Sequence, residues 1–591
     1  ARVDNNDFAQ ESVTFDNSAS YSYANSDGGL QNNAGSSGLT GDVVSITEPF
    51  VDVLKSVENV TKPGLPPDAG DVLRYRITLT ASGGDDAPVD FFSDAFDVSL
   101  DDTLSLGLLF IDNSQAVDGA GNSIDLPVTN AADGVTTAQT LSWNLAQGNA
   151  DIDVIEGTTV TVSYDVLVLD SVLADQNLSN TVDIQWSSRD GPNVPGGSGE
   201  FERDGSGLPL NDYFNLLPAE TLETTPDSNT IVKSRVTDTY NPVAPNDSIV
   251  RIGDIVEYEL RINMQEGTSP NFIVQDTLPE GLIFEQTVSI NGQTVAPYSA
   301  VAPSPFSHTA IPEAAVSGDP ATGPTTVTWT PGGNVLNPGD VINAGDNDIT
   351  NDDFIIVYRA RVLNLALPQL PTNTTLANNV SFDYDMAGGV PAPTKTGNES
   401  LTLQQPELSI TKTSSPVGGS VIGAGDVITY TVEIRNDGDA PAYDTELLDT
   451  IPFGLRSPAI TMVSMQLLSG TPLPGVLAPV YDPVSGTANW NFDTGVADAY
   501  NIPVGDTLQI VYQVQADAGL GAGLVMTNSA QVQFYYSFDN DATPTVGGIT
   551  GVREIYGPSI LELESLNSTR ANPLLIENPA DLVVSIGETF T

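Results

Sequence analysis

Three lysines recur with the same two companions, and the side chains of each set could form an amide bond. The chain has 591 residues but only 19 Lys and Arg together. In three places a lysine on a predicted first strand is followed by an aspartate near a turn. An asparagine then opens the closing strands of the same stretch. The three sets are Lys55, Asp102 and Asn180; Lys233, Asp276 and Asn379; and Lys412, Asp449 and Asn528.

An isopeptide bond between the lysine and the asparagine is the chemistry that such a set could perform. Burial would lower the pKa of the lysine and leave a neutral, nucleophilic amine. A protonated aspartate would polarise the asparagine carbonyl, and ammonia would leave. The bond would clamp the first strand to the last, as a disulfide does, in a chain without cysteine. The alternative is a solvent-facing lysine, a turn aspartate and an asparagine that caps backbone groups.

Carboxylate clusters in predicted loops are the second feature with chemical potential. The chain carries 77 Asp and Glu, and its formal net charge is −58. Calcium takes roughly six to eight oxygen ligands, and carboxylates gathered without a cation repel one another. The alternative is a solvated acidic surface that keeps the protein soluble. We predict calcium at two clusters, Asp346, Asp348, Asp352 and Asp353, and Asp539 and Asp541.

Several classes of function are excluded by what the sequence lacks. No cysteine is present, so disulfides, thiolate metal sites and thiol catalysis are impossible. The one histidine, His308, lies among Ser and Pro with no nucleophile motif near it, so we predict that the chain is not an enzyme. The scarcity of Lys and Arg excludes nucleic acid and anionic membrane surfaces as partners. No apolar run reaches ~18 residues, so we predict no membrane insertion in this segment.

The elements that would position these side chains are strands of a tandem repeat. A Gly-Asp pair is followed by strict alternation of apolar and polar residues at 70–79, 253–262 and 425–434. A period of two predicts a half-buried strand. Further residues recur after each such strand in one order, as Asp102, Trp143 and Tyr164; Asp276, Trp329 and Tyr358; and Asp449, Trp490 and Tyr512. We therefore expect the tyrosines that these strands share to be buried at equivalent positions, namely Tyr75, Tyr258 and Tyr430.

The chain therefore divides into repeats, each predicted to be an all-β sandwich of two sheets. No segment has a long helical period, and 41 Pro and 53 Gly punctuate the chain. The segment Leu561–Glu564, read as the start of a further repeat, has no lysine. The predicted divisions are the closing strands of a preceding repeat in 1–47, sandwiches in 48–227, 228–405 and 406–556, and the opening strand of a further repeat in 557–591.

The two partial ends admit two explanations. In the first, the sequence is a window on a longer protein; in the second, half-repeats from neighbouring subunits complete one sandwich by donor-strand complementation. The partial ends together lack the Asp-Thr turn, the tryptophan and the tyrosine of a whole repeat. We favour the window on a longer protein.

The third copy carries a motif set that resembles the DUF11 repeat domain of very large bacterial surface proteins. It reads Pro-x-Leu-x-Ile-x-Lys, Gly-Asp-x-Ile-x-Tyr-x-Val-x-Ile-x-Asn, Asp-Thr-Ile-Pro-x-Gly-Leu and Thr-Asn-Ser-Ala-x-Val. The second copy has Asn271 where the others have Asp97 and Asp444. The first copy has an insertion around 82–93, and its ending looks like the acidic repeats of giant adhesins. The resemblance implies Ig-like sandwiches in an elongated rod, export to the cell surface, and no activity.

The sequence therefore favours a structural or adhesive stalk or fibre in a large extracellular protein. Short Pro-containing linkers would hold neighbouring repeats at fixed angles. Its partners would be neighbouring repeats of the same chain, identical subunits, or cell-surface and matrix components. The alternative is a subunit of a self-assembling extracellular filament, sheath or surface layer. A carbohydrate-binding module also stays open, because exposed aromatic residues cannot be told from core ones in the sequence.

Overall fold

The computed structural model describes most of the chain between residues 14 and 567. The described residues are 14–17, 23–24, 30–31, 42–45, 48–82, 93–117, 123–124, 127–143, 152–190, 213–216, 220–238, 248–300, 304–363, 373–456, 459–495, 499–521, 523–537, 555–559 and 561–567.

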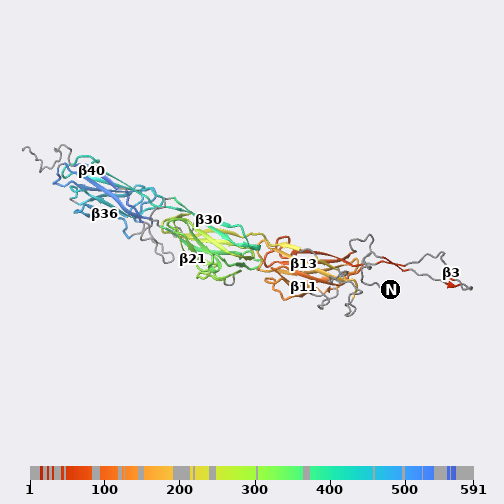
Figure 1. The fold of residues 1–591 in the computed structure, drawn as a ribbon. Helices are drawn as coiled ribbons and strands as arrows, with labels where there is room; N and C mark the ends of the chain where they lie inside the picture. Colours follow the sequence, from red (N-terminus) through yellow and green to blue (C-terminus); the bar gives the residue numbers. More distant parts are fainter. Residues whose placement is uncertain are drawn as a thin grey trace, which may run out of the picture.

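The described part of the chain is all-β, as the sequence predicted. Apart from strands it contains two 3-10 turns, Pro331–Gly333 and Ala387–Gly389. No helix among the described residues is long and apolar enough to span a membrane. Figure 1 shows three bodies that follow one another along the chain, and each has a hydrophobic core of its own. We call these bodies the first, second and third sandwich.

One sheet of each sandwich has four strands in the same spatial order. The first strand lies at an edge, pairs with the Gly-Asp strand, and that strand pairs with the tyrosine-bearing strand. These sheets are β5 (Phe50–Asn59), β6 (Val72–Ser82), β12 (Thr159–Val168) and β8 (Leu108–Val117); β16 (Thr230–Asp238), β18 (Ile255–Asn263), β26 (Asp353–Val362) and β21 (Leu282–Ile290); and β31 (Leu408–Ser415), β32 (Val427–Asn436), β37 (Thr507–Gln515) and β34 (Thr461–Leu467).

The facing sheet also repeats in all three sandwiches. The aspartate strand lies between the tryptophan strand and the asparagine strand, and a last strand pairs beyond the asparagine strand. These sheets are β11 (Thr140–Trp143), β7 (Phe96–Leu104), β13 (Asn177–Ser187) and β15 (Glu220–Glu223); β24 (Thr325–Trp329), β20 (Ile273–Leu278), β27 (Thr375–Asp383) and β30 (Lys395–Leu403); and β36 (Thr487–Asn491), β33 (Tyr443–Thr450), β38 (Val525–Tyr536) and β40 (Glu562–Asn567).

Shorter strands extend these sheets or pair with one another. Near the N-terminus β1 pairs with β4, and β2 pairs with β3. The shorter strands are β1 (Thr14–Asn17), β2 (Tyr23–Ala24), β3 (Leu30–Gln31), β4 (Asp42–Ser45), β9 (Ser123–Ile124), β10 (Val128–Thr129), β14 (Phe214–Leu216), β17 (Ile249–Val250), β19 (Gly267–Ser269), β22 (Phe306–His308), β23 (Ala315–Ser317), β25 (Val341–Asn343), β28 (Asp385–Met386), β29 (Val390–Pro391), β35 (Val480–Asp482) and β39 (Ile555–Tyr556).

The alternation of apolar and polar residues sends one side of every long strand into a core. Tyr75, Tyr258 and Tyr430 are fully buried, at equivalent places in the three Gly-Asp strands. Each lies directly opposite a second buried tyrosine on the neighbouring strand, as in the pair of Tyr75 and Tyr164. The predicted equivalence of the three tyrosines is therefore confirmed.

The start of each aspartate strand explains a difference that the sequence comparison of the repeats revealed. Asp97, Asn271 and Asp444 have positive φ values of 49°, 54° and 45°. Asp and Asn tolerate this left-handed conformation better than other residues that have a Cβ. The exchange of Asp for Asn in the second sandwich therefore preserves the backbone conformation.

The assignment of residues 557–591 to a further repeat needs a correction for its described part. β40 pairs antiparallel with β38, and Asn528 lies opposite Glu564. β40 is thus the last strand of the third sandwich, equivalent to β15 and β30. The absence of a lysine in Leu561–Glu564 follows, because this segment is a last strand rather than a first one. The predicted opening strand around 585–591 lies outside the described residues.

Candidate functional site

A buried polar cluster connects the two sheets of the first sandwich. The Lys55 ammonium on β5 donates to the Asp102 carboxylate on β7, with 2.6 Å between Nζ and Oδ2. The Tyr164 hydroxyl on β12 donates to the same oxygen at 2.7 Å. The Asn180 amide on β13 donates to that hydroxyl at 2.7 Å. All four side chains are buried, so the sandwich holds a lysine, an aspartate, a tyrosine and an asparagine in its core.

The third sandwich repeats this cluster. Lys412 forms a buried ion pair with Asp449 and donates to the Tyr512 hydroxyl at 3.0 Å. Tyr512 donates to Asp449 at 2.6 Å, and Asn528 donates to Tyr512 at 2.8 Å. The residues predicted from the sequence for this sandwich are thus brought together, and Tyr512 is added to them.

The second sandwich has the same cluster but with a different asparagine from the predicted one. Lys233 forms a buried ion pair with Asp276 and donates to the Tyr358 hydroxyl at 3.0 Å. The asparagine that donates to this hydroxyl, at 2.9 Å, is Asn378. The predicted Asn379 is exposed and points away from the core. Inward-facing residues of β27 have even numbers, so strand parity alone would have selected Asn378.

Tyrosine rings lie beside each lysine ammonium, and a tryptophan packs against one tyrosine of each cluster. In the second sandwich the Nζ of Lys233 lies 4.8 Å from the ring centre of Tyr258 and 5.6 Å from that of Tyr358. The Trp329 ring packs against Tyr358 with 5.3 Å between centres.

Lys412 lies beside Tyr430 and Tyr512 in the same way, and the Nζ of Lys55 lies 5.4 Å from the ring centre of Tyr75. Ring faces at such distances attract a cation.

Burial acts on the pKa values of the lysine and the aspartate in opposite directions. It is the largest influence on each, lowering the pKa of Lys233 to about 8 and raising the pKa of Asp276. Their mutual attraction opposes these shifts without reversing them. The same directions hold for Lys55, Asp102 and their equivalents in the third sandwich. Each pair is therefore displaced toward a neutral amine and a neutral carboxylic acid.

Two oxygens in each cluster have no hydrogen-bond donor among the described residues. They are the Oδ1 of the aspartate and the Oδ1 of the asparagine, and both are buried. Buried acceptors without a donor are rare in folded proteins. The atoms concerned belong to Asp102 and Asn180, Asp276 and Asn378, and Asp449 and Asn528.

A glutamate next to each cluster was missed by the sequence analysis. Glu220, Glu399 and Glu564 lie on the last strands, each directly opposite the cluster asparagine. Each acts to raise the pKa of the lysine in its sandwich. The sequence signal is weak, because the last strands are separated from the asparagine strands by segments of different length.

In the structure, the four aspartates predicted as calcium ligands in the loop 346–353 interact with hydrogen-bond donors or a cation of the protein itself. Asp346 accepts from Asn351 at 2.9 Å, Asp348 from Thr350 at 2.6 Å and Asp352 from Asn343 at 2.8 Å, while Asp353 pairs with Arg261 at 2.7 Å. No group of three or more metal-ligating side chains is found in the part of the chain that the structure describes. Asp539 and Asp541 lie outside the described residues. Calcium binding therefore stays a prediction.

The junction between the first and second sandwiches contains direct backbone hydrogen bonds. The Thr268 amide donates to the Val172 carbonyl at 2.8 Å. The Ala387 amide donates to the Ala174 carbonyl at 3.1 Å. These bonds join backbone groups of two different sandwiches and so restrict the angle between them.

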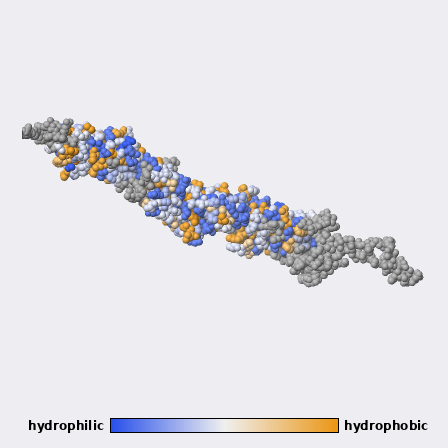
Figure 2. Space-filling view, turned by 45° about the horizontal axis from the view of Figure 1, so that its top comes forward, coloured by the Kyte–Doolittle hydropathy of each residue, from blue (hydrophilic) through white to orange (hydrophobic). Residues whose placement is uncertain are grey.

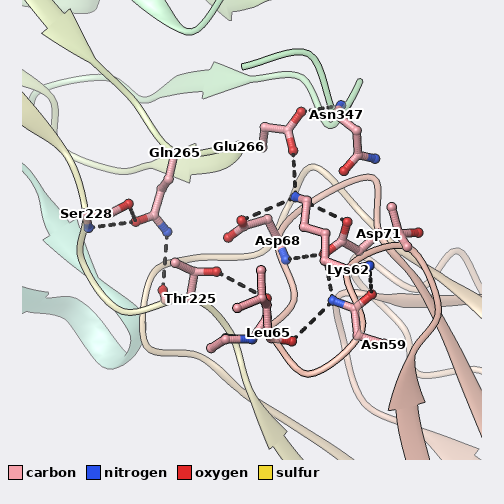
Figure 3. A network of polar contacts seen from close by, with 12 residues as sticks. Asn59, Lys62, Leu65, Asp68, Asp71, Thr225, Ser228, Gln265, Glu266 and Asn347 are labelled. Atoms are coloured by element: carbon pink, nitrogen blue, oxygen red, sulfur yellow. Dashed lines mark hydrogen bonds and ion pairs between the residues drawn. The ribbon is translucent and has the colours of Figure 1, made fainter.

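A lysine occupies the centre of this junction (Figure 3). Its ammonium lies 3.2 Å from Asp71, 3.5 Å from Asp68 and 3.5 Å from Glu266 of the second sandwich. Burial acts to lower the pKa of Lys62, but the carboxylates around it outweigh burial and raise this pKa. Glu266 also accepts from the Asn347 amide. One cation of the protein itself therefore neutralises carboxylates from both sandwiches.

Two glycines allow the junction to close. A Cβ on Gly70 would lie 2.2 Å from the Gly345 carbonyl oxygen, and a Cβ on Gly345 would lie 2.3 Å from the backbone at Ala69 and Gly70. Gly345 also donates its amide hydrogen to Asp170 at 2.9 Å. No side chain fits between these loops, so the backbones of the two sandwiches are in contact.

The linker at 404–407 is held by the third sandwich in a similar way. The Asp437 amide donates to the Glu407 carbonyl at 2.7 Å. The Asp439 amide donates to the Gln405 carbonyl at 2.9 Å. Hydrogen bonds to the carbonyls of Gln405 and Glu407 therefore attach this linker to the third sandwich.

Comparisons with known proteins identify no family for this chain. No protein-family model matches it, and no curated protein matches it, so the resemblance to DUF11 repeats stays a prediction.

Solved structures of bacterial surface proteins are similar in parts. The C-terminal domain of the Streptococcus agalactiae AgI/II polypeptide BspA is 12% identical with a TM-score of 0.30, covering 57% of this chain and 99% of that chain. BcpA, the major pilin subunit of Bacillus cereus, is 10% identical with a TM-score of 0.22, covering 79% and 93%. A putative membrane anchored protein from Corynebacterium diphtheriae is 10% identical with a TM-score of 0.19, covering 88% and 97%. At TM-scores this low, these similarities carry no argument about function.

Proposed function

We propose that this chain is a non-enzymatic structural or adhesive stalk region of a large bacterial surface protein, located outside the cell. The observation that carries the proposal is the junction between the first and second sandwiches, in which backbone groups of one sandwich bind backbone groups of the next. Junctions of this kind favour an elongated rod with fixed angles between its units. The function of such a rod is to project or connect whatever lies at its ends.

The surface supports this proposal. The formal charge of −58 keeps the chain soluble and discourages collapse onto other acidic surfaces. On the face shown in Figure 2, hydrophobic residues lie in several separate groups among hydrophilic ones. A stalk needs such a surface, because its sides must stay free of non-specific contacts.

Small-angle scattering of the purified chain tests the proposal. A stalk gives a concentration-independent, elongated monomer whose maximal dimension corresponds to the arrangement in Figure 1. A compact particle, or a broad distribution of distances between sandwiches, would contradict it. Ordered polymers in negative stain would instead support the alternative, a subunit of an extracellular filament, sheath or surface layer.

A further inference from the structure

The buried clusters are difficult to explain as permanent ion pairs. A charge pair in a core is favourable only when additional hydrogen bonds satisfy its remaining lone pairs. In each sandwich the aspartate and the asparagine keep one buried oxygen without a donor among the described residues. The arrangement occurs in all three sandwiches, with the same four residue types on equivalent strands. It is therefore a conserved feature of the repeat rather than an irregularity of one sandwich.

The lysine and the asparagine meet at the tyrosine hydroxyl in the second and third clusters, and in the first cluster Lys55 and Tyr164 donate to the same Asp102 oxygen while Asn180 donates to Tyr164. In the second sandwich the Lys233 Nζ and the Asn378 Nδ2 both lie within 3.0 Å of the Tyr358 hydroxyl oxygen. In the third sandwich the Lys412 Nζ and the Asn528 Nδ2 lie within 3.0 Å of the Tyr512 hydroxyl oxygen. A nucleophile and an electrophile are thus held together in a dry core.

We propose that each sandwich cross-links itself through an isopeptide bond between the lysine Nζ and the asparagine Cγ. The bonds would join Lys55 to Asn180, Lys233 to Asn378 and Lys412 to Asn528. Each would connect the edge strand of one sheet to the facing sheet.

The reaction needs no cofactor and balances within the cluster. The neutral amine attacks Cγ, and the proton of the aspartic acid stabilises the oxygen of the tetrahedral intermediate. The carboxylic acid then donates its proton to Nδ2, the Cγ–Nδ2 bond breaks, and Nδ2 leaves as ammonia. The carboxylate formed in this way takes one proton from the former lysine nitrogen and ends as the acid again. The sum is one amine and one primary amide converted to one secondary amide and one ammonia.

The surroundings provide the protonation states that this reaction requires. Burial lowers the pKa of the lysine and raises the pKa of the aspartate, so the neutral forms become accessible at ordinary pH. The pKa of Tyr358 is raised well above 10, mainly by burial. This hydroxyl therefore keeps its proton and acts as a positioning residue that orients the leaving amide nitrogen.

Intact-mass spectrometry of the denatured full-length chain tests the proposal. We expect a mass lower than that of the sequence by three molecules of ammonia. Asn378→Ala should restore one ammonia, whereas Asn379→Ala, at the exposed neighbouring position, should restore none. Asp449→Asn should also restore one, although it removes neither the lysine nor the asparagine of its cluster.

Tandem mass spectrometry must locate each loss, because Asn291 precedes Gly292 and could lose ammonia by succinimide formation. A branched peptide joining Lys412 to Asn528 supports the proposal. Tyr512→Phe should slow formation of this branch in freshly refolded protein without changing its final position. An unmodified mass from a chain whose amide hydrogens show native protection against exchange would overturn the proposal, and so would branches at other residues.

Discussion

Asn378 and Asn379 are adjacent and chemically identical, but the pleat of β27 gives them opposite surroundings. Asn378 is fully buried and donates to Tyr358, whereas Asn379 is exposed. This pair offers a matched comparison of a cluster residue with its neighbour.

Asn378→Ala should lower the free energy of unfolding of the second sandwich by about 5 kcal/mol, the chain-entropy value for opening the loop that the bond closes between Lys233 and Asn378. Asn379→Ala should change it by less than about 0.5 kcal/mol, as expected for an exposed position. Native-state hydrogen exchange measures both values in the intact chain. A loss of only about 1 kcal/mol for Asn378→Ala would indicate a lost hydrogen bond without a lost covalent bond.

The titration of Lys233 predicts how pH acts on a sandwich that is not cross-linked. Its pKa is about 8 in the folded state against a usual value of 10.5. Between these values the unfolded state binds more protons, so stability rises with pH across this window. In Asn378→Ala the gain should be on the order of 3 kcal/mol from pH 8 to pH 10.5.

The raised pKa of Asp276 affects the free energy of unfolding at lower pH, and there stability changes with pH in the opposite direction. The folded state keeps this proton longer than the unfolded state, so stability falls as pH rises above the usual carboxyl range. The triple variant that also carries Lys233→Met and Asp276→Asn is the control, because it lacks both titrating groups. Equal pH profiles of the two variants between pH 8 and 10.5 would contradict the shift of Lys233.

At the scale of elements, β40 completes the third sandwich from the far end of the described chain. It pairs with β38 over Val525–Ala530 and brings Glu564 beside the cluster. Without it, β38 would present an open edge to solvent.

A chain ending after Ser559 should therefore have a less stable third sandwich and should aggregate. A chain ending after Asn567 should behave like the full-length protein, because it keeps β40. Light scattering during heating, with exchange protection of β38 amides, compares the two truncations. Unchanged protection of β38 in the shorter chain would show that β40 contributes little.

The strands could be predicted from the alternation of apolar and polar residues, because this alternation indicates that one face of each strand is buried. It placed the inward tyrosines of β6, β18 and β32 correctly. The lysine and the aspartate of each cluster were instead found from their recurrence in the three repeats, and the structure brings them together. The asparagine was found in two sandwiches, where it follows the cluster tyrosine by 16 residues, and was wrong in the second, where this separation is 20.

The pairing of last strands and the junction contacts could not be predicted. Both depend on contacts between residues that are far apart in the sequence. The alternation of apolar and polar residues shows which face of a strand is buried but not which strand it pairs with. The glutamates opposite the asparagines and the lysine between the first two sandwiches are therefore known only from the structure.

At the scale of the whole molecule, Lys62 takes the place that a metal ion would have between acidic loops. Lys62→Met should leave Asp68, Asp71 and Glu266 without their shared cation and widen the distribution of angles between the first two sandwiches. Its effect on stability should be about 1 kcal/mol, because the ammonium is only partly buried. Distances between fluorophores attached to the two sandwiches would report the change, with Arg435→Met as the control, because Arg435 pairs with Asp437 in the third sandwich. An unchanged distribution would leave the backbone contacts as the main constraint.

Calcium should raise the melting temperature if the predicted acidic clusters bind it. Binding to the folded form alone stabilises by ~2.7 kcal/mol at a free ion concentration 100 times the dissociation constant. The melt is compared in chelator, millimolar calcium and millimolar magnesium at matched ionic strength, since sodium alone also screens the charge. Equal melting temperatures in all three would leave a solvated acidic surface as the explanation of these residues.

The contact between Gly70 and Gly345 has a consequence for how such arrays evolve. Genes that encode tandem repeats gain and lose repeats by recombination between similar segments. A repeat tolerates a new neighbour when the linker between them is flexible. Here one sandwich accepts the backbone of the next at a place where a single methyl group would not fit. A deletion that joined the first sandwich to a different successor would bring unmatched loops to this surface. The first and second sandwiches should therefore be inherited as a pair, and copy number in related genes should vary in steps that keep the pair together.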